Sequence, residues 1–249
     1  MQEKINSNLS DLLIIVGSGS HILKGYQPPC ENKLIIKADR ENSDKRFSNK
    51  EFFVKYDLKN DDRNEIDLIE KIYELSPNKI DILFASYSSK GLEKNSSISE
   101  ISESLKANIG KPLKLFSTLS DKFNNNVISG VFISSMYAKV SPNKFIYDSP
   151  EEVNPLFYGA AKAAVEQGIK WLSCQNDKHR FNSITLGAMP KKKAQESQPT
   201  LMKNLKKRIP SGRFVKHEEL FETINFIFNE KCKSLRGENI VLDGGYTIW

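Results

Sequence analysis

Tyr158 and Lys162 are the residues whose types and spacing could most directly carry out chemistry. They stand four positions apart in Tyr158-Gly-Ala-Ala-Lys162. On a helix, residues four apart lie on one face, one turn from each other. A lysine ammonium beside a phenol favours the phenolate, so the tyrosine pKa is predicted to fall from about 10 towards neutral pH. The pair is therefore predicted to donate and accept a proton.

Two serines precede this pair. Ser134 and Ser135 directly follow the apolar segment 126–133. A hydroxyl from either serine could hold a substrate carbonyl or alcohol against the phenol. A Tyr-x-x-x-Lys pair by itself also arises by chance in many helices. Its meaning therefore depends on the elements that position it.

Short apolar segments alternate with amphipathic ones along the chain, which predicts βαβ units and a parallel sheet covered by helices on both faces. We therefore expect a Rossmann-like, doubly wound α/β fold, with residues 1–249 forming a single domain. The strands are predicted over 12–16, 33–39, 52–57, 80–85, 126–133, 181–186 and 239–242, and the helices over 62–75, 101–123, 156–172 and 217–228.

Several polar or small residues directly follow predicted strands. In parallel sheets ligands bind at the carboxyl ends of the strands. Asp39 ends the second strand, where a carboxylate can hydrogen-bond a ribose 2′-hydroxyl, although a simple turn aspartate is the alternative. Arg40 follows and leaves a 2′-phosphate possible. The sequence therefore favours NAD over NADP without excluding either.

Composition bounds the class of protein. The chain has 249 residues, of which 39% are hydrophobic and 27% charged, with a net charge of +6. No apolar run approaches the roughly 20 residues of a membrane helix, and the first residues lack the apolar stretch of a signal peptide. The three cysteines are isolated, form no metal-type pair and favour a reducing, cytoplasmic setting. The lysines of 191–193 and 206–207 are not interleaved with aromatics, so no nucleic-acid partner is expected.

These features together resemble the short-chain dehydrogenase/reductase family. The resemblance rests on Tyr158 with Lys162, the two serines, the segment from Arg180 to Gly187, the turn 209–213 and the closing Asp243-Gly244-Gly245. It covers nearly the whole chain and implies an NAD(P)-dependent enzyme that interconverts a carbonyl and a secondary alcohol. The segment between Ser135 and Tyr158 and the end at Trp249 look like bacterial reductases of surface-glycan and flagellin-glycosylation pathways. That likeness implies a sugar-derived substrate.

The resemblance also implies roles for individual residues. Ser135 would orient the substrate, Tyr158 would be the general acid or base, Lys162 would lower its pKa and bind the nicotinamide ribose, and Asn108 would complete the proton relay. Residues 191–210 would form a substrate loop or lid, and a homodimer or homotetramer is expected. If the substrate is an acidic sugar or a nucleotide sugar, Lys191 to Lys193 could attract it, although simple solvated lysines are the favoured alternative. The positions implied to bind cofactor are Gly17, Gly19, His21, Ile22, Asp39, Asp57, Leu58, Ala85, Lys162 and Gly187.

The chain departs from the family pattern on the cofactor side. His21 and Leu23 stand where the family has glycines that let the backbone approach a pyrophosphate. Pro28 and Pro29 leave room for only a short helix before the second strand. Tyr87 is predicted to narrow the space that small residues normally leave after the fourth strand. An alternative is therefore a degenerate member with no dinucleotide redox role, either an isomerase or lyase or a non-catalytic binding subunit.

Overall fold

The structure is a computed structural model that describes residues 10–29, 33–41, 49–59, 63–85, 87, 96–147 and 153–249. The predictions made for the first eight residues, Cys30, Asp62 and the serines on either side of Tyr87 lie outside this part of the chain.

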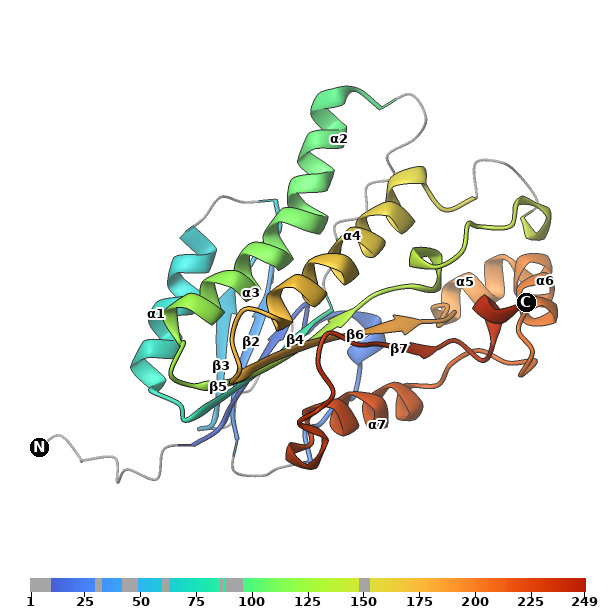
Figure 1. Cartoon of the computed structure of the whole chain (residues 1–249). Helices are drawn as coiled ribbons and strands as arrows, with labels where there is room; N and C mark the ends of the chain where they lie inside the picture. The colour runs from blue at the N-terminus through green and yellow to red at the C-terminus, as the bar shows by residue number, and fades with distance from the viewer. Residues whose placement is uncertain are drawn as a thin grey trace, which may run out of the picture.

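A seven-stranded parallel sheet forms the centre of the molecule (Figure 1), with the strand order β3-β2-β1-β4-β5-β6-β7. This order confirms the predicted Rossmann-like, doubly wound fold, and the observed strand ends lie within two residues of the predicted ones. The strands are β1 (Leu12–Val16), β2 (Leu34–Asp39), β3 (Glu51–Lys55), β4 (Lys79–Phe84), β5 (Val127–Ile133), β6 (His179–Leu186) and β7 (Asn239–Leu242).

Helices cover both faces of the sheet (Figure 1), because strands such as β1 and β4 are buried throughout and need apolar cover on each side. On one face lie α1 (Arg63–Leu75), α3 (Lys111–Lys122) and α4 (Leu156–Ser173). They pack Leu68, Phe116 and Val165 against the strands. On the other face, α7 (His217–Phe228) contributes Leu220, Ile224 and Ile227 to a second core.

The long predicted helix 101–123 is present but interrupted. It starts earlier, as α2 (Ile98–Leu105), and passes through the π-helical turn η2 (Lys106–Gly110) before α3. Pro112 lacks the backbone N–H that an α-helix would direct at the Asn108 carbonyl. The Lys111 N–H donates to the Lys106 carbonyl five residues back, as in a π-turn. Such turns are frequent at functional sites.

The segment predicted as a loop over 191–210 is mostly helical, which corrects that expectation. It forms α5 (Lys192–Ser197) and α6 (Pro199–Arg208), which lie beside the C-terminus in Figure 1. The buried side chains Leu201, Met202 and Leu205 share one face of α6 and pack in a third apolar cluster with Met136 and Tyr246. This packing stabilises a helix whose lysine-rich sequence gives a weak signal alone.

The chain between β1 and β2 holds only the single 3₁₀ turn η1 (His21–Leu23), as the prolines predict. Positive φ angles occur at Gly17 (82°) and Gly25 (85°) in this stretch, and at neither His21 nor Leu23. The conformation therefore does not require glycine at those two positions. Leu23 is buried in the core beneath α7, so its side chain contributes to stability there.

Further single 3₁₀ turns connect the larger elements. Two of them, η3 (Met136–Ala138) and η4 (Lys144–Ile146), lie between β5 and α4, η6 (Glu230–Cys232) follows α7, and η7 (Tyr246–Ile248) ends the chain.

Candidate functional site

One cavity of about 1000 Å³ lies at the carboxyl ends of the strands. It brings together all the predicted catalytic and cofactor-binding residues except Asn108. The predicted residues lining it are Gly17, Gly19, His21, Ile22, Asp39, Asp57, Leu58, Ala85, Ser134, Ser135, Tyr158, Lys162 and Gly187. These residues come from turns far apart in the sequence, and the sheet order explains why they meet.

The phenol of Tyr158, the ammonium of Lys162 and the hydroxyl of Ser135 meet at one end of this cavity. Tyr158 and Lys162 lie one turn apart on α4, and Ser135 lies in the turn after β5. The Ser135 hydroxyl lies beside the Tyr158 phenol and acts to lower its pKa, and the Ser135 Oγ accepts from the Tyr137 N–H at 3.2 Å. A Cβ at position 159 would collide with the Tyr137 carbonyl oxygen, so Gly159 lets α4 pack closely against the turn that contains Tyr137.

The pKa of Tyr158 differs from the sequence expectation. Burial raises it above the ordinary 10.0, and the Ser135 hydroxyl offsets only part of this rise. The free-energy cost of removing the phenolate from water exceeds the stabilisation that Ser135 gives it. The prediction that the adjacent lysine lowers the Tyr158 pKa below 10 is therefore wrong for the protein without a bound ligand. The side chain holds its proton at neutral pH.

Lys162 is a buried ammonium with an altered pKa. Its Nζ donates to the Ile133 carbonyl at 2.9 Å and lies over the rings of Phe132 (4.6 Å to the centroid) and Tyr87 (5.1 Å). Burial lowers the Lys162 pKa to about 7, and the charge of Glu166 opposes this change. The Lys162 amine is therefore present in both its protonated and its neutral form near neutral pH.

Asn108 lies in the π-turn and is buried, but it does not line the cavity. Its amide Nδ2 donates to the Ser104 carbonyl at 2.9 Å and to the Ser104 Oγ at 3.2 Å. This bonding accounts for an asparagine inside a helix, where the residue is otherwise unfavourable. The structure therefore does not bring Asn108 into the cavity with the other three residues.

The other end of the cavity is formed by the turn after β1 and the end of β2. The Asp39 carboxylate accepts from the Gly19 N–H at 2.8 Å and the Arg40 N–H at 2.7 Å. Asp57 accepts from the Lys59 N–H at 3.0 Å. The Asp39 carboxylate thus ties the glycine turn to the end of β2.

Tyr87 is more closely involved than the sequence indicated. Its ring packs edge-on against Tyr158, with 4.8 Å between the ring centroids. Burial raises the Tyr87 pKa to about 12. This side chain lines the cavity beside both Tyr158 and Lys162.

A polar wall of the cavity was not predicted. The Tyr137 and Tyr147 hydroxyls lie 2.9 Å apart, and the Asn154 amide donates to the Tyr147 hydroxyl at 3.3 Å. All three residues line the cavity. They fall in the segment between Ser135 and Tyr158, where the density of tyrosine and asparagine was the available signal.

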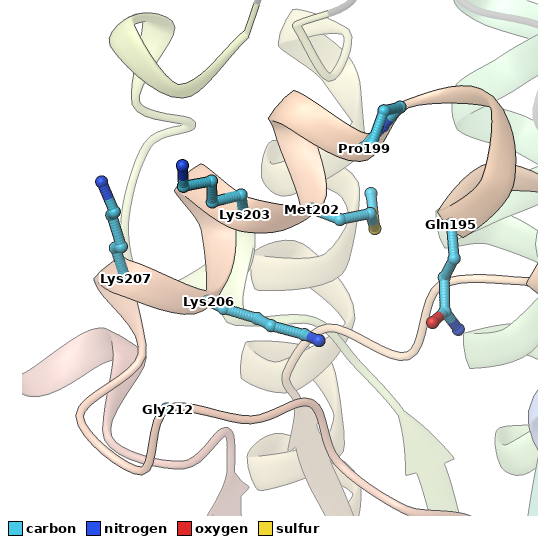
Figure 2. Close-up of a pocket in the computed structure, with 7 residues that line it drawn as sticks. All are labelled: Gln195, Pro199, Met202, Lys203, Lys206, Lys207 and Gly212. Atoms are coloured by element: carbon cyan, nitrogen blue, oxygen red, sulfur yellow. The ribbon is translucent and has the colours of Figure 1, made fainter.

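The predicted basic clusters divide between two places. Lys191 lines the main cavity. A separate pocket of about 590 Å³ lies on the outside of α5 and α6, and in Figure 2 the Lys206 side chain extends across it. Its lining residues are Gln195, Pro199, Met202, Lys203, Lys206, Lys207 and Gly212.

Neither a metal cluster nor a membrane helix is found in the described residues. No group of three or more histidine, cysteine or acidic side chains there is placed to hold a metal ion. Within the same residues, none of the helices combines the length and apolar character needed to cross a bilayer.

Known proteins resemble this chain in sequence and in fold. A family model described as enoyl-(acyl carrier protein) reductase matches residues 36–247. The enoyl-acyl-carrier-protein reductase (NADH) FabI of Bacillus cereus is 31% identical over 94 residues, which cover 36% of this chain. The match spans only 37% of that protein's length.

Solved structures match over nearly the full length. A short-chain dehydrogenase of Leptospira borgpetersenii with bound NAD⁺ has a TM-score of 0.75 at 19% identity, over 96% of this chain and 94% of that one. The Pseudomonas aeruginosa RhlG/NADP active-site complex has a TM-score of 0.76 at 15% identity, over 97% and 98%. These likenesses show the fold, and the family model matches most of the sequence. The chain belongs to the short-chain dehydrogenase/reductase family.

Proposed function

We propose that this chain is an NAD(P)-dependent oxidoreductase that interconverts a carbonyl group and a secondary alcohol. The observation that carries the proposal is the shared cavity. A serine hydroxyl, a phenol and an ammonium converge at one end of it, and the glycine turn and the Asp39 carboxylate lie at the other. The first group can move a proton, and the second can hold a nucleotide.

The residues present fit a nicotinamide dinucleotide. A cavity of about 1000 Å³ is at the upper end of the range for small-molecule sites. Ser134 is one of the lining residues, and its Oγ is buried with no hydrogen-bond partner among the described residues. Such a buried hydroxyl is costly unless a ligand satisfies it. We propose that Gly17, Gly19, His21, Ile22, Asp39, Asp57, Leu58, Ala85, Lys162 and Gly187 hold the dinucleotide, which when bound supplies or accepts a hydride.

The chain's own residues would handle the proton. In the reductive direction, the Ser135 hydroxyl orients the substrate oxygen and Tyr158 donates its proton to that oxygen. The raised Tyr158 pKa keeps this proton available at neutral pH. Protonated Lys162 stabilises the phenolate that remains. Asn108 lies outside the cavity, so in this proposal it would act from the π-turn by helping a proton from solvent reach Lys162.

For the substrate, we favour a hydroxylated, sugar-derived compound. The hydroxyls of Tyr137 and Tyr147 and the amide of Asn154 line the cavity and provide both donors and acceptors. A hydroxylated substrate satisfies such groups, whereas an unbranched acyl chain would leave them unpaired. Lys191 is the first residue of the segment 191–210 and lines the cavity, so it would attract a negative charge on the substrate. That segment would then act as the substrate lid.

For the cofactor, we favour NAD. The Asp39 carboxylate lies at the end of β2 in the cavity and would repel a 2′-phosphate. Arg40 also lines the cavity and is the group that would oppose this preference.

We also propose that the protein forms a homodimer or homotetramer and is located in the cytoplasm. Trp171 on α4 is 60% exposed and Ile98 on α2 is 81% exposed, which supports pairing of these helices with a second copy in a homodimer or homotetramer. Cys174 and Cys232 are free thiols, which suits the cytoplasm.

The test is NADH oxidation with a panel of keto-sugars and simple ketones. We expect at least one carbonyl compound to be turned over, and Tyr158→Phe to reduce kcat by about 100-fold or more while NADH still binds. Turnover that Tyr158→Phe leaves unchanged would reject Tyr158 as the acid. The alternative of a non-redox family member would be favoured if NADH bound but no carbonyl compound consumed it.

A further inference from the structure

The side chain of His21 joins two parts of the cavity wall that are remote in sequence. Its Nε2 lies 2.8 Å from the carbonyl oxygen of Met189, 168 residues further along the chain. A carbonyl oxygen only accepts hydrogen bonds, so Nε2 must carry a proton and donate it. His21 belongs to the turn η1, and Met189 belongs to the segment after β6, residues 187–191, which we call the β6 loop. Both line the cavity.

The turn that carries His21 is held in place by α7. The His217 Nε2 on α7 donates to the His21 carbonyl at 2.8 Å. Tyr26, just after η1, packs on Phe221 with 5.2 Å between ring centroids and donates to Asn225 at 3.1 Å. The short turn is thus docked on α7 at several points. His21 is therefore a rigid attachment point rather than an exposed side chain on a free loop.

Among the described residues, the β6 loop is held by a few hydrogen bonds and by the packing of Met189 and Ala188 on the second and third apolar clusters. The Gly187 N–H donates to the Leu242 carbonyl at 2.9 Å, and the Ala188 carbonyl accepts from the Val215 N–H at 3.1 Å. The next is the bond from His21 to Met189. After it, the Pro190 carbonyl accepts from Gln195 at 2.9 Å, which lies within the segment that leads into α5 and α6. The histidine bond is thus placed where the β6 loop leaves the sheet.

We propose that His21 is a positioning residue that fastens the β6 loop to the dinucleotide end of the cavity. The histidine that replaces a family glycine would then add a contact rather than merely obstruct a phosphate. Occupancy of the turn 17–22 and ordering of the β6 loop become coupled through this bond, and such coupling acts equally in both directions. This second consequence rests on the proposed function, whereas the attachment itself exists without a ligand.

The test compares His21→Leu with His21→Gln in the full chain. The two replacements have similar volume, but only glutamine keeps an N–H donor for the Met189 carbonyl. Tyr26→Phe is the matched control, because it removes a hydrogen bond from the same η1–α7 junction without reaching the β6 loop. Amide hydrogen exchange of residues 187–198 is followed by mass spectrometry without cofactor and then with NADH. NADH affinity is measured by fluorescence titration.

Without cofactor, we expect His21→Leu to speed exchange in residues 187–191 by roughly two- to tenfold, the range that the loss of one hydrogen bond gives. His21→Gln and Tyr26→Phe should stay close to the wild type. NADH should slow this exchange in the wild type and less so in His21→Leu, whose Kd should be roughly two- to tenfold weaker.

Equal exchange in the wild type and His21→Leu would overturn the proposal. So would a His21→Gln variant as loose as His21→Leu, or a Tyr26→Phe variant that loosens the β6 loop as much. If the wild type binds neither NADH nor NADPH, the proposed function fails. The exchange comparison without cofactor still decides whether His21 fastens the loop.

Discussion

Replacing Lys162 by methionine should stabilise the protein at neutral pH while removing its proposed activity. Lys162 is buried, and burial lowers its pKa from 10.5 to about 7. A pKa difference of this size corresponds to about 5 kcal/mol of cost for holding the charged form in the native state. Methionine has similar volume, carries no charge and avoids this cost. It loses the hydrogen bond to the Ile133 carbonyl, a contribution of about 1 kcal/mol.

The pH dependence gives the effect its signature. Between pH 7 and 10.5 the unfolded chain holds more protons at this lysine than the native state does, so the wild-type free energy of unfolding rises with pH across that window. The cost of the buried charge is about 4 kcal/mol at pH 7 and about 1 to 2 kcal/mol at pH 9.5. After subtracting the lost hydrogen bond, Lys162→Met should be more stable than the wild type by about 3 kcal/mol at pH 7 and by under about 1 kcal/mol at pH 9.5.

The assay is urea unfolding followed by tryptophan fluorescence, at both pH values and one protein concentration. Lys170→Met is the control, because Lys170 is exposed on the same helix and should change stability by under about 0.5 kcal/mol. A Lys162→Met variant that is less stable at pH 7, or whose stability difference does not change with pH, would refute the reasoning.

Three substitutions test other parts of the site. Asp39→Asn should weaken the preference for NADH over NADPH by roughly tenfold, measured as the ratio of the two Kd values, because the repelling charge is removed; an unchanged ratio would remove Asp39 from cofactor selection. Gly187→Ala should lower the free energy of urea unfolding by about 1–3 kcal/mol or more, because its Cβ would lie 2.6 Å from the Asp243 Cα. Leu23→Ala should lower it by about 2–5 kcal/mol, because this side chain is only 4% exposed; a neutral result would mean that Leu23 does not support η1.

Much of the fold could be predicted because its signals are local. The continuous apolar strands and the helical spacing of apolar residues sufficed for the seven strands and for the four predicted helices, which correspond to α1, α2 with α3, α4 and α7. The helices α5 and α6 could not be predicted in this way. Three buried side chains of α6 pack against Met136 and Tyr246, which are distant in sequence, and only the fold brings them together.

The candidate site could be predicted in its composition but not in its electrostatics. Residues at strand ends converge because the strands are parallel, and this rule needs no coordinates. The pKa of Tyr158 depends on how deeply α4 buries it, which the spacing to Lys162 does not contain. The contact between His21 and Met189 likewise depends on the docking of η1 on α7. Asn108 shows that a residue at the matching position of the family's sequence pattern need not lie in the cavity.

Dinucleotide binding tests the central claim most directly. Urea unfolding of the wild type is measured alone and with NADH or NADPH at up to millimolar concentration. The proposed function predicts that NADH raises the free energy of unfolding, by about 2.7 kcal/mol when its concentration is 100 times Kd. NADPH should raise it less. No change with either dinucleotide at millimolar concentration would contradict the assignment of this cavity to a nicotinamide cofactor.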